Sequence, residues 1–265
     1  MEVIDLAWWK LGLAALLVLA LAATAYLGRL DITRSLLVAA IRTVIQLALI
    51  GLVLKALFAS SAFYWIALLA AVMLLVAGRE VVARQGRRLK GGWAFGIGTG
   101  AMFVSSFTVT VLALAVVIGP KPWYTPQYAI PLLGMMLGNT MTGVSLALDR
   151  LNDSVWRQRA VIENRLMLGQ TWQQALEDIR REAMRSGMMP SINAMAAAGI
   201  VSLPGMMTGQ ILAGSPPAVA VKYQILVMLI ITVGTGFGAV MAVSWGGRRL
   251  FDDRERLRLD RLTKP

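Results

Sequence analysis

Two six-residue segments of nearly identical composition carry the residues best suited to contact a solute in an apolar environment. They read GMMLGN at 134–139 and GMMTGQ at 205–210, so each has two methionines and one side-chain amide between small residues. A thioether is a soft, polarisable donor, and an amide both donates and accepts hydrogen bonds. A solute path through these two hexads would be lined by Met135, Met136, Asn139, Met206, Met207 and Gln210.

Packing is the alternative interpretation of the hexads. Gly134 with Gly138, and Gly205 with Gly209, have the small-x-x-x-small spacing that lets membrane helices approach closely. Methionine fills irregular gaps between helices, and an interhelical hydrogen bond is the simplest role for each hexad amide. Packing is therefore favoured for the glycines, whereas both interpretations stay open for the methionines.

The side chains that the sequence lacks exclude several kinds of chemistry. There is no His and no Cys, and the acidic residues fall outside the apolar segments or at their rims. This disfavours a membrane enzyme and disfavours proton or sodium coupling through carboxylates. No G-x-x-x-x-G-K-[ST] segment occurs, so the chain does not itself hydrolyse ATP. We predict no metal site and expect the methionines, whose thioethers suit Cu(I) better than iron, to form an adaptable apolar gate.

Membrane-spanning helices are the elements that must position the hexads. Of the 265 residues, 57% are hydrophobic and only 15% are charged, which is too apolar for a protein dissolved in water. Apolar runs of about 18 residues or more cross a bilayer as helices. We predict an all-α, multi-pass membrane protein with seven spans, at 7–28, 35–57, 61–79, 95–118, 126–148, 190–213 and 216–245.

The distribution of basic residues indicates the orientation. Most of the 26 Lys and Arg residues follow the first, third, fifth and seventh predicted spans. By the positive-inside rule the N-terminus is outside and the C-terminus is cytoplasmic. The acidic residues ahead of the first span argue against a cleaved signal peptide. The expected organisation is a membrane domain over 1–245 with a cytoplasmic loop at 149–189, then a basic tail over 246–265 that faces lipid rather than nucleic acid.

Arg42 and Gln46 are polar residues inside the second predicted span. The guanidinium of Arg42 either snorkels to the cytoplasmic surface or contacts an anion such as a phosphate or a carboxylate-bearing chelate. Both residues are therefore candidates for the solute path. Pro204 interrupts the sixth predicted span just before the second hexad, and with Gly205 it predicts either a hinge or a fixed kink.

The loop 149–189 contains a predicted amphipathic helix. Thr171 and Gln174 have the spacing of a capping box, and apolar residues then recur every three to four positions. Gly187 and Pro190 predict the end of this helix. The helix either lies on the lipid surface or inserts as a coupling helix into a nucleotide-binding subunit. The candidates for contact with such an ATPase are Glu163, Arg165, Gly169, Thr171 and Trp172.

Several stretches together resemble one family, the FetB-type permeases of ABC transporters, which includes the plant aluminium-sensitivity permeases. The resemblance covers about residues 35–245 and agrees in the order of its motifs. The stretches are IRTVIQLALIGLVL, PLLGMMLGNTMTGVSLALDRL, IENRLMLGQTWQQAL and MMPSINAMAAAGIVSLPGMMTGQILAGSPP.

The resemblance implies a permease subunit in a bacterial inner membrane that pairs with a FetA-type ATPase and with a second copy of itself. ATP and magnesium would be bound by the partner ATPase, and this chain would carry no cofactor. The implied activity is export of iron or of an iron-linked solute by alternating access. A self-contained secondary transporter or channel is the alternative, and a membrane enzyme is the third.

Overall fold

The computed structural model describes residues 7–59 and 62–263. Predicted boundaries that fall on residues 1–6, 60–61 and 264–265 lie outside this part of the chain. The regular elements within it are helices, accompanied by isolated bridges, which confirms the predicted all-α class. Contacts divide the chain into two compact units, Met1–Ser61 with Leu212–Gly214, and Ala62–Ile211 with Ser215–Pro265.

The first unit is a pair of apolar helices, α1 (Trp8–Leu27) and α2 (Thr33–Ala59). They pack on one another, joined by a short turn in which Arg29 and Asp31 have positive φ. Most of their leucine and valine side chains are exposed. Exposed apolar side chains along a helix of this length are typical of a surface that meets lipid.

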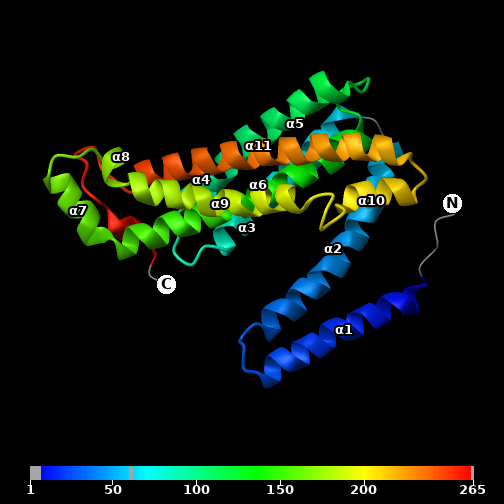
Figure 1. Ribbon diagram of the computed structural model, residues 1–265, viewed down its shortest axis with the longest axis horizontal. Coiled ribbons are helices and arrows are strands. Elements are labelled where there is room, and N and C mark those ends of the chain that lie inside the picture. Colours follow the sequence, from blue (N-terminus) through cyan, green and yellow to red (C-terminus); the bar gives the residue numbers. More distant parts are fainter. Residues whose placement is uncertain (1–6, 60–61, 264–265) are drawn as a thin grey trace. The chain divides into compact units, whose positions relative to one another are not determined.

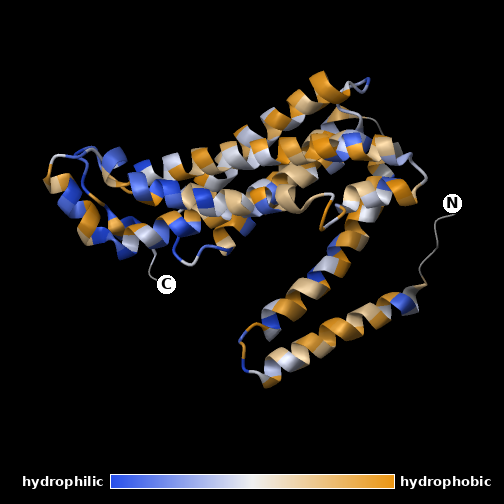
Figure 2. Ribbon diagram, viewed as in Figure 1, coloured by the Kyte–Doolittle hydropathy of each residue, from blue (hydrophilic) through white to orange (hydrophobic). Residues whose placement is uncertain are grey.

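The second unit contains the hexads, and Figure 1 shows its helices running alongside one another. Its elements along the chain are α3 (Phe63–Ala83), α4 (Trp93–Met102), η1 (Phe103–Phe107), α5 (Thr108–Leu112), η2 (Ala113–Ile118), α6 (Pro126–Arg157), α7 (Arg159–Met167), α8 (Trp172–Ala175), α9 (Glu177–Ala197), α10 (Gly205–Leu212), α11 (Pro217–Arg249) and η3 (Leu259–Arg261). The segment from α4 to η2 is one continuous helix in which two π-helical stretches alternate with α-helix. Figure 2 shows hydrophilic residues gathering on α7, α8 and the adjoining end of α9.

Six helical segments of the described chain are long and apolar enough to cross a membrane. They are Trp9–Leu27, Thr33–Lys55, Phe63–Ala83, Trp93–Ile118, Pro126–Arg157 and Pro217–Arg249. Each corresponds to a predicted span. The sixth predicted span, 190–213, is not one helix: residues 198–204 separate the end of α9 from α10. The predicted orientation of the termini stays a prediction.

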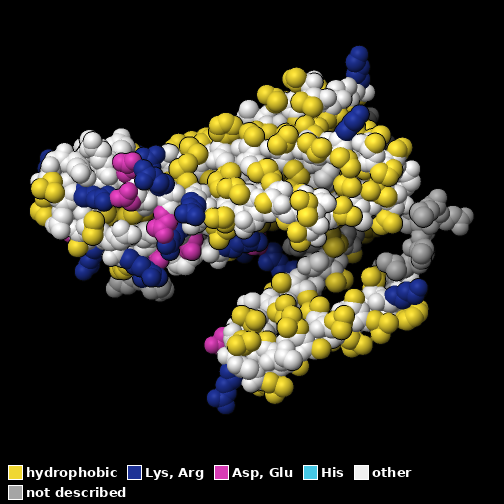
Figure 3. All heavy atoms as spheres, in the orientation of Figure 1, with side chains coloured by type: hydrophobic (Ala, Val, Ile, Leu, Met, Phe, Trp, Pro, Cys, Tyr) yellow, Lys and Arg dark blue, Asp and Glu magenta, His cyan; other side chains and the backbone are white. Residues whose placement is uncertain are grey.

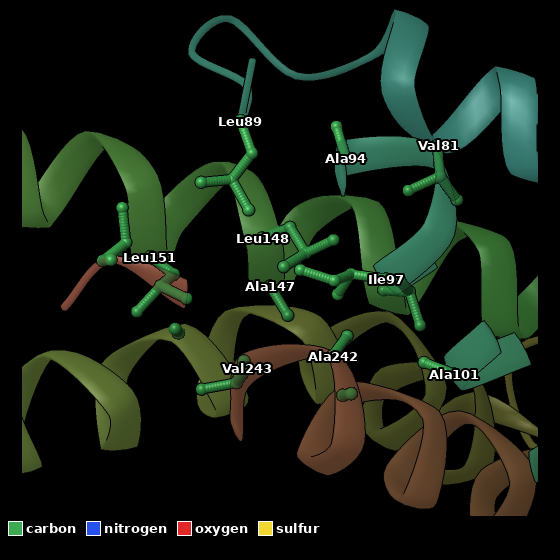
Figure 4. Packing of buried hydrophobic residues seen from close by; sticks show 14 of the residues in the cluster. Val81, Leu89, Ala94, Ile97, Ala101, Ala147, Leu148, Leu151, Ala242 and Val243 are labelled. Atoms are coloured by element: carbon green, nitrogen blue, oxygen red, sulfur yellow. The ribbon is translucent and has the colours of Figure 1, made fainter. Parts of the chain in front are cut away.

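Close contacts between α6, α9 and α11 form the centre of the second unit. A Cβ added to Gly187 of α9 would lie 2.6 Å from the backbone oxygen of Gly143 in α6 and 2.9 Å from the Cβ of Ala147. Only glycine allows so close a helix crossing. Figure 4 shows Ala147, Leu148 and Leu151 of α6 packed near Ala242 and Val243 of α11, all fully or almost fully buried. The bundle is therefore held by small residues and by leucine and valine side chains between them.

The predicted end of the amphipathic helix at Gly187 and Pro190 is wrong. Helix α8 contains only Trp172–Ala175, and after a turn at Leu176 a separate helix, α9, passes through Gly187 and Pro190 to Ala197. Gly187 serves the crossing with α6 rather than a helix end. Proline and glycine are tolerated within helices that pack on neighbours in a membrane protein.

Residues 250–263 fold back onto the second unit. Leu250, Phe251 and Leu262 are buried in the same core as α6. Backbone hydrogen bonds join this segment to the loop between α3 and α4: Lys90 N–H donates to Arg261 O at 2.7 Å, and Thr263 N–H donates to Arg88 O at 2.9 Å. The expected basic tail is therefore an ordered part of the fold as far as residue 263.

Candidate functional site

The structure brings parts of the two hexads together around one cavity of about 190 Å³. Helix α6 contributes Met135 and Asn139, and α10 contributes Met206. Helix α11 contributes Gln224 and Met228. Met135 and Met206 also pack against the same small apolar cluster, which is centred on residues such as Leu132 and Val227. We call this space the hexad cavity.

A second cavity, of about 460 Å³, adjoins the hexad cavity. The two share Pro204, Gln224 and Met228 as lining residues. The second cavity adds Met195 and Met207. Five methionines therefore surround the two connected spaces, so that thioethers and apolar side chains form most of their walls.

Gln224 is the most informative residue of this site. Its side chain is only 7% exposed, and its Oε1 atom is buried with no hydrogen-bond partner in the described part of the chain. A buried amide oxygen without a partner costs free energy, so a partner is expected from outside the chain, as a solute or as water. Sequence reasoning missed Gln224. The signal was present, since an amide within the last apolar segment is a polar exception among leucine, valine and methionine.

Met136 and the two hexad amides have different surroundings. Met136 is fully buried, lies against Gly234 of α11 and lines neither cavity, which agrees with the packing interpretation. The expected interhelical hydrogen bond of Asn139 is wrong, because its Nδ2 donates to Met135 O of its own helix at 2.8 Å. Gln210 lines neither cavity, and its Oε1 is buried without a partner among the described residues.

The close-packing role predicted for the hexad glycines is largely wrong within this chain. A Cβ added to Gly138, Gly205 or Gly209 would meet no atom of the described residues within 4 Å, and one added to Gly134 would meet only the end of Met73. The glycines that hold helices together lie elsewhere, at Gly143, Gly187, Gly234 and Gly238. The hexad glycines therefore leave free space beside their helices and do not bring two helices of this chain into close contact.

The break predicted at Pro204 is confirmed. Residues 198–204 are not helical, Gly199 has a φ of +83°, and α10 begins at Gly205 with the second hexad as its first six residues. Because Pro204 lines both cavities, the break shapes the site directly. Whether Pro204 and Gly205 act as a hinge stays a prediction.

Arg42 and Gln46 lie on α2, in the first unit, and both side chains are exposed. Neither residue lines the hexad cavity or its neighbour. Their place on a solute path stays a prediction that only the assembled protein can test.

The predicted ATPase-contact residues lie on α7, α8 and the turn between them. The capping box is confirmed: Thr171 N–H donates to Gln174 Oε1 at 2.9 Å, and Gln174 N–H donates back to the Thr171 hydroxyl. The N–H of Trp172 donates to Glu255 at 2.9 Å, which ties α8 to the folded-back tail. Gly169, with a φ of +83° and open space around it, gives the turn a conformation that favours glycine.

Two of these candidates differ in their contacts. Glu163 is exposed on α7. Arg165 forms an ion pair with Asp178 of α9 at 2.7 Å, and this hydrogen-bonded pair lowers the pKa of the Asp178 carboxyl. Arg165 therefore positions α7 against α9. The apolar side chains that protrude here are Met167 and Leu168, which are 77% and 81% exposed.

The donor set of the hexad cavity contains no charged group. Its polar atoms come from the amides Asn139 and Gln224 and from the hydroxyls Ser191 and Thr232. No three His, Cys, Asp or Glu residues of the described chain lie together in a way that would hold a metal ion. The cavity is thus suited to an apolar or weakly polar surface with a few hydrogen-bonding groups.

Comparison with known proteins identifies the family. The profile of the uncharacterised protein family UPF0014 matches residues 8–251. The UPF0014 membrane protein slr1647 of Synechocystis is 38% identical over 255 residues, which cover 96% of this chain and 97% of that protein. The probable iron export permease protein FetB of Escherichia coli is 30% identical over 260 residues, 96% of each chain. ALUMINUM SENSITIVE 3 of Arabidopsis thaliana is 33% identical over 217 residues, 81% of this chain and 77% of that protein.

These matches confirm the resemblance found in the sequence. No solved structure matches the chain. The family match, the length of chain it covers and the six apolar helices agree with one another. The chain therefore belongs to the UPF0014 family of multi-pass membrane proteins, whose members include a probable iron export permease.

Proposed function

We propose that this chain is the permease subunit of an ABC transporter that exports iron or an iron-linked small solute. Two copies would pair with two FetA-type ATPase subunits, which bind ATP and magnesium and supply the energy for alternating access. Support comes from the similarity to a probable iron export permease along almost the whole chain. The chain itself would hold no cofactor.

The hexad cavity is the observation that carries this proposal. It collects Met135, Asn139 and Met206, three of the residues predicted for a solute path, and adds the unpaired oxygen of Gln224. The cavity thus contains a hydrogen-bond acceptor that has no donor among the described residues, within an apolar space lined by methionines. Such a space is suited to a passing solute because flexible methionines adapt to different shapes.

The chemistry of the cavity favours a chelate or another small organic solute over a bare ferric or ferrous ion. Iron prefers carboxylate, imidazole or thiolate ligands. The lining of the cavity offers thioethers, amides and hydroxyls instead. A chelate would present its own apolar and hydrogen-bonding surface to these groups and keep the iron in its own ligand set.

The α7–α8 turn is the proposed contact with the ATPase. It lies in the hydrophilic part of the second unit, where charged side chains gather at the end of the helices away from the hexads (Figure 2 and Figure 3). Met167 and Leu168 at this turn are 77% and 81% exposed. Exposed apolar side chains in a polar surrounding mark interaction surfaces. The hydrogen bond from Trp172 to Glu255 and the Arg165–Asp178 pair hold this turn against the rest of the unit. A displacement of the turn by the ATPase would therefore also displace α9, which lines the hexad cavity through Ser191.

The test is the ATPase rate of the purified permease–ATPase complex in lipid, with candidate solutes added one at a time. One solute is expected to stimulate hydrolysis, and Met135→Ala, Met206→Ala and Gln224→Leu are expected to weaken that stimulation. Leu146→Ala is the control, because Leu146 is exposed on α6 and lines neither cavity. Equal stimulation in all variants would remove the hexad cavity from the transport path.

Contact with the ATPase is tested separately. Leu168→Asp is expected to weaken the complex with the ATPase while leaving the isolated chain folded, because Leu168 is 81% exposed. If no stable complex with an ATPase forms even for the unmodified chain, the ABC assignment is wrong, and a self-contained secondary transporter or channel becomes the better interpretation.

A further inference from the structure

A groove at one end of the second unit has a composition unlike that of the hexad cavity. Its volume is about 820 Å³, and it lies between the first turns of α4 and the last turns of α11. Phe251, Asp252 and other residues of the folded-back tail complete its lining. A cavity of about 410 Å³ that includes Lys90 adjoins it. We call the two spaces together the basic groove.

Tryptophans mark the level of the basic groove relative to the spans. Trp93 begins the apolar segment Trp93–Ile118, and Trp245 is close to the end of Pro217–Arg249. Their side chains are 52% and 42% exposed. Tryptophan near the end of a span prefers the level of the lipid headgroups, where its apolar ring contacts lipid and its N–H contacts water. The groove is therefore expected at the surface of the bilayer.

A stacked arginine stands in this groove. The guanidinium of Arg249 lies 4.1 Å from the centre of the Trp93 ring, so the ring fixes the direction of its N–H groups. Arg249 and Trp93 line both parts of the groove. A planar guanidinium held in one orientation matches two oxygens of a phosphate group, which is the geometry of bidentate phosphate recognition.

The carboxylates in the groove do not neutralise all its cations. The paired groups are Asp253 with Arg248, Asp252 with Arg256, and Asp260 with Arg258. The ion pairs formed by the described residues include neither Lys90 nor Arg249 nor Arg261. Arg261 donates from Nη1 to the backbone oxygens of Arg249 and Phe251 and attracts Asp260 at longer range, and its other N–H groups add to the positive field. Three cations thus face the groove beyond those matched by carboxylates.

We propose that the basic groove binds the phosphate headgroup of an anionic phospholipid. Arg249 and Lys90 would hold the phosphate, Trp93 and Trp245 would cover the glycerol region, and the acyl chains would follow the apolar exteriors of the adjoining spans. Phe103 and Phe237, on the helices that reach the groove, are 50% and 59% exposed and offer such an exterior. The tryptophan rim at the ends of spans favours a lipid over a free anion or an acidic protein surface. The proposal is independent of what the protein transports.

The test measures lipid-dependent stability of the full chain purified in a neutral detergent. Phosphatidylglycerol, phosphatidylcholine and inorganic phosphate are titrated separately, and the midpoint of thermal unfolding is recorded. Phosphatidylglycerol is expected to raise the midpoint, whereas the other two at the same concentrations are not. The variant Lys90→Gln/Arg249→Gln is expected to need about tenfold more phosphatidylglycerol for the same rise, because two cations that attract the headgroup are lost.

The matched control removes the same charge elsewhere. Arg157→Gln/Arg181→Gln removes two arginines that are 75% and 73% exposed and that pair with carboxylates outside the groove. Its response to phosphatidylglycerol is expected to stay within about twofold of the unmodified chain. The single change Lys90→Gln, at an exposed side chain, serves if the double variant at the groove fails to fold.

Several results would overturn the proposal. An equal loss of response in both double variants would mean that net charge alone attracts the lipid. Equal stabilisation by phosphatidylcholine would exclude headgroup charge, and stabilisation by inorganic phosphate alone would show a free-anion site. If none of the three additives raises the unfolding midpoint, and only an added ATPase subunit does so in a way that depends on Lys90 and Arg249, the groove is a protein interface.

Discussion

The two hexads have nearly the same sequence and very different surroundings. GMMLGN lies in the N-terminal half of α6, a helix of 32 residues, and Met136 there is fully buried. GMMTGQ forms the first six residues of α10, a helix of eight residues that follows a break and has no buried residue. Yet one methionine of each hexad reaches the same cavity.

The comparison teaches that helix context decides the role of each hexad residue. In the long helix α6, Met135 faces the cavity and the next residue, Met136, faces a neighbouring helix, because consecutive residues are about 100° apart. In a short helix at a break, neither methionine is enclosed by the chain. The α6 hexad is therefore a fixed wall of the cavity, and the α10 hexad is the less constrained wall.

Truncating one methionine from each hexad tests this difference most strongly. Met136→Ala is expected to lower the free energy of unfolding by about 2–4 kcal/mol, because a fully buried side chain leaves a cavity. Met207→Ala, at a half-buried position, is expected to cost less than about 1 kcal/mol. The measurement is denaturant unfolding of the purified chain in mixed micelles. Equal costs would show that the two hexads are equally well packed.

The glycines provide the second test. Gly187→Ala is expected to destabilise the chain by about 1–3 kcal/mol, since the new Cβ would overlap the backbone oxygen of Gly143 across the α6–α9 crossing. Gly209→Ala, in the α10 hexad with open space around it, is expected to be neutral or stabilising by up to about 1 kcal/mol. The same unfolding assay compares them. A large cost at Gly209 would indicate that another subunit packs there.

The amides provide the third test, in which stability and function are expected to change in opposite directions. Gln224→Leu removes a buried oxygen that has no partner, so the free energy of unfolding without solute is expected to rise by about 1 kcal/mol. Solute-stimulated ATPase activity is expected to fall in the same variant. Asn139→Ala loses only a hydrogen bond within its own helix and is expected to change stability by less than about 1 kcal/mol. A destabilised Gln224→Leu variant would mean that the amide is satisfied in the protein.

The smallest expected effect is that of low pH, which should act on the tail at 250–263 and not on the hexads, because the hexads contain no titratable group. A side-chain hydrogen bond from Arg258 is the main reason why the pKa of Asp260 falls from 3.8 to about 2. A lowered carboxyl pKa stabilises the fold above the unfolded value, so this contribution is complete above about pH 4 and is lost as the pH falls through about 2. Pepsin cleavage within residues 250–262 is expected to increase over this range. Asp252, held by Arg256, also has a lowered pKa, so Asp260→Asn should reduce the rise in cleavage relative to the unmodified chain at each pH without abolishing it. An unchanged profile in this variant would contradict the assignment.

The sequence predicted the spans well because apolar runs of sufficient length have few alternatives to a membrane helix. It also predicted the break at Pro204 and the cap at Thr171, which depend on local backbone chemistry. The crossing at Gly187 was not predictable from the sequence. A glycine can mark either the end of a helix or a close contact between helices, and only the position of the neighbouring helix distinguishes the two. Gln224 was overlooked because only the tertiary arrangement shows that its oxygen has no partner.

The return of residues 261–263 to the loop at 88–90 has a consequence for biosynthesis. The N–H of Arg88 donates to the Thr263 hydroxyl across 175 residues of sequence. At usual rates of translation this leaves roughly 9–35 s between the synthesis of the two partners. During that interval Arg88 and Lys90, in the loop between α3 and α4, lack these later partners, and this part of the loop is open to proteases and chaperones. Residues made about 175 positions later thus complete the first loop of the second unit, and this loop stays accessible to quality control until they arrive.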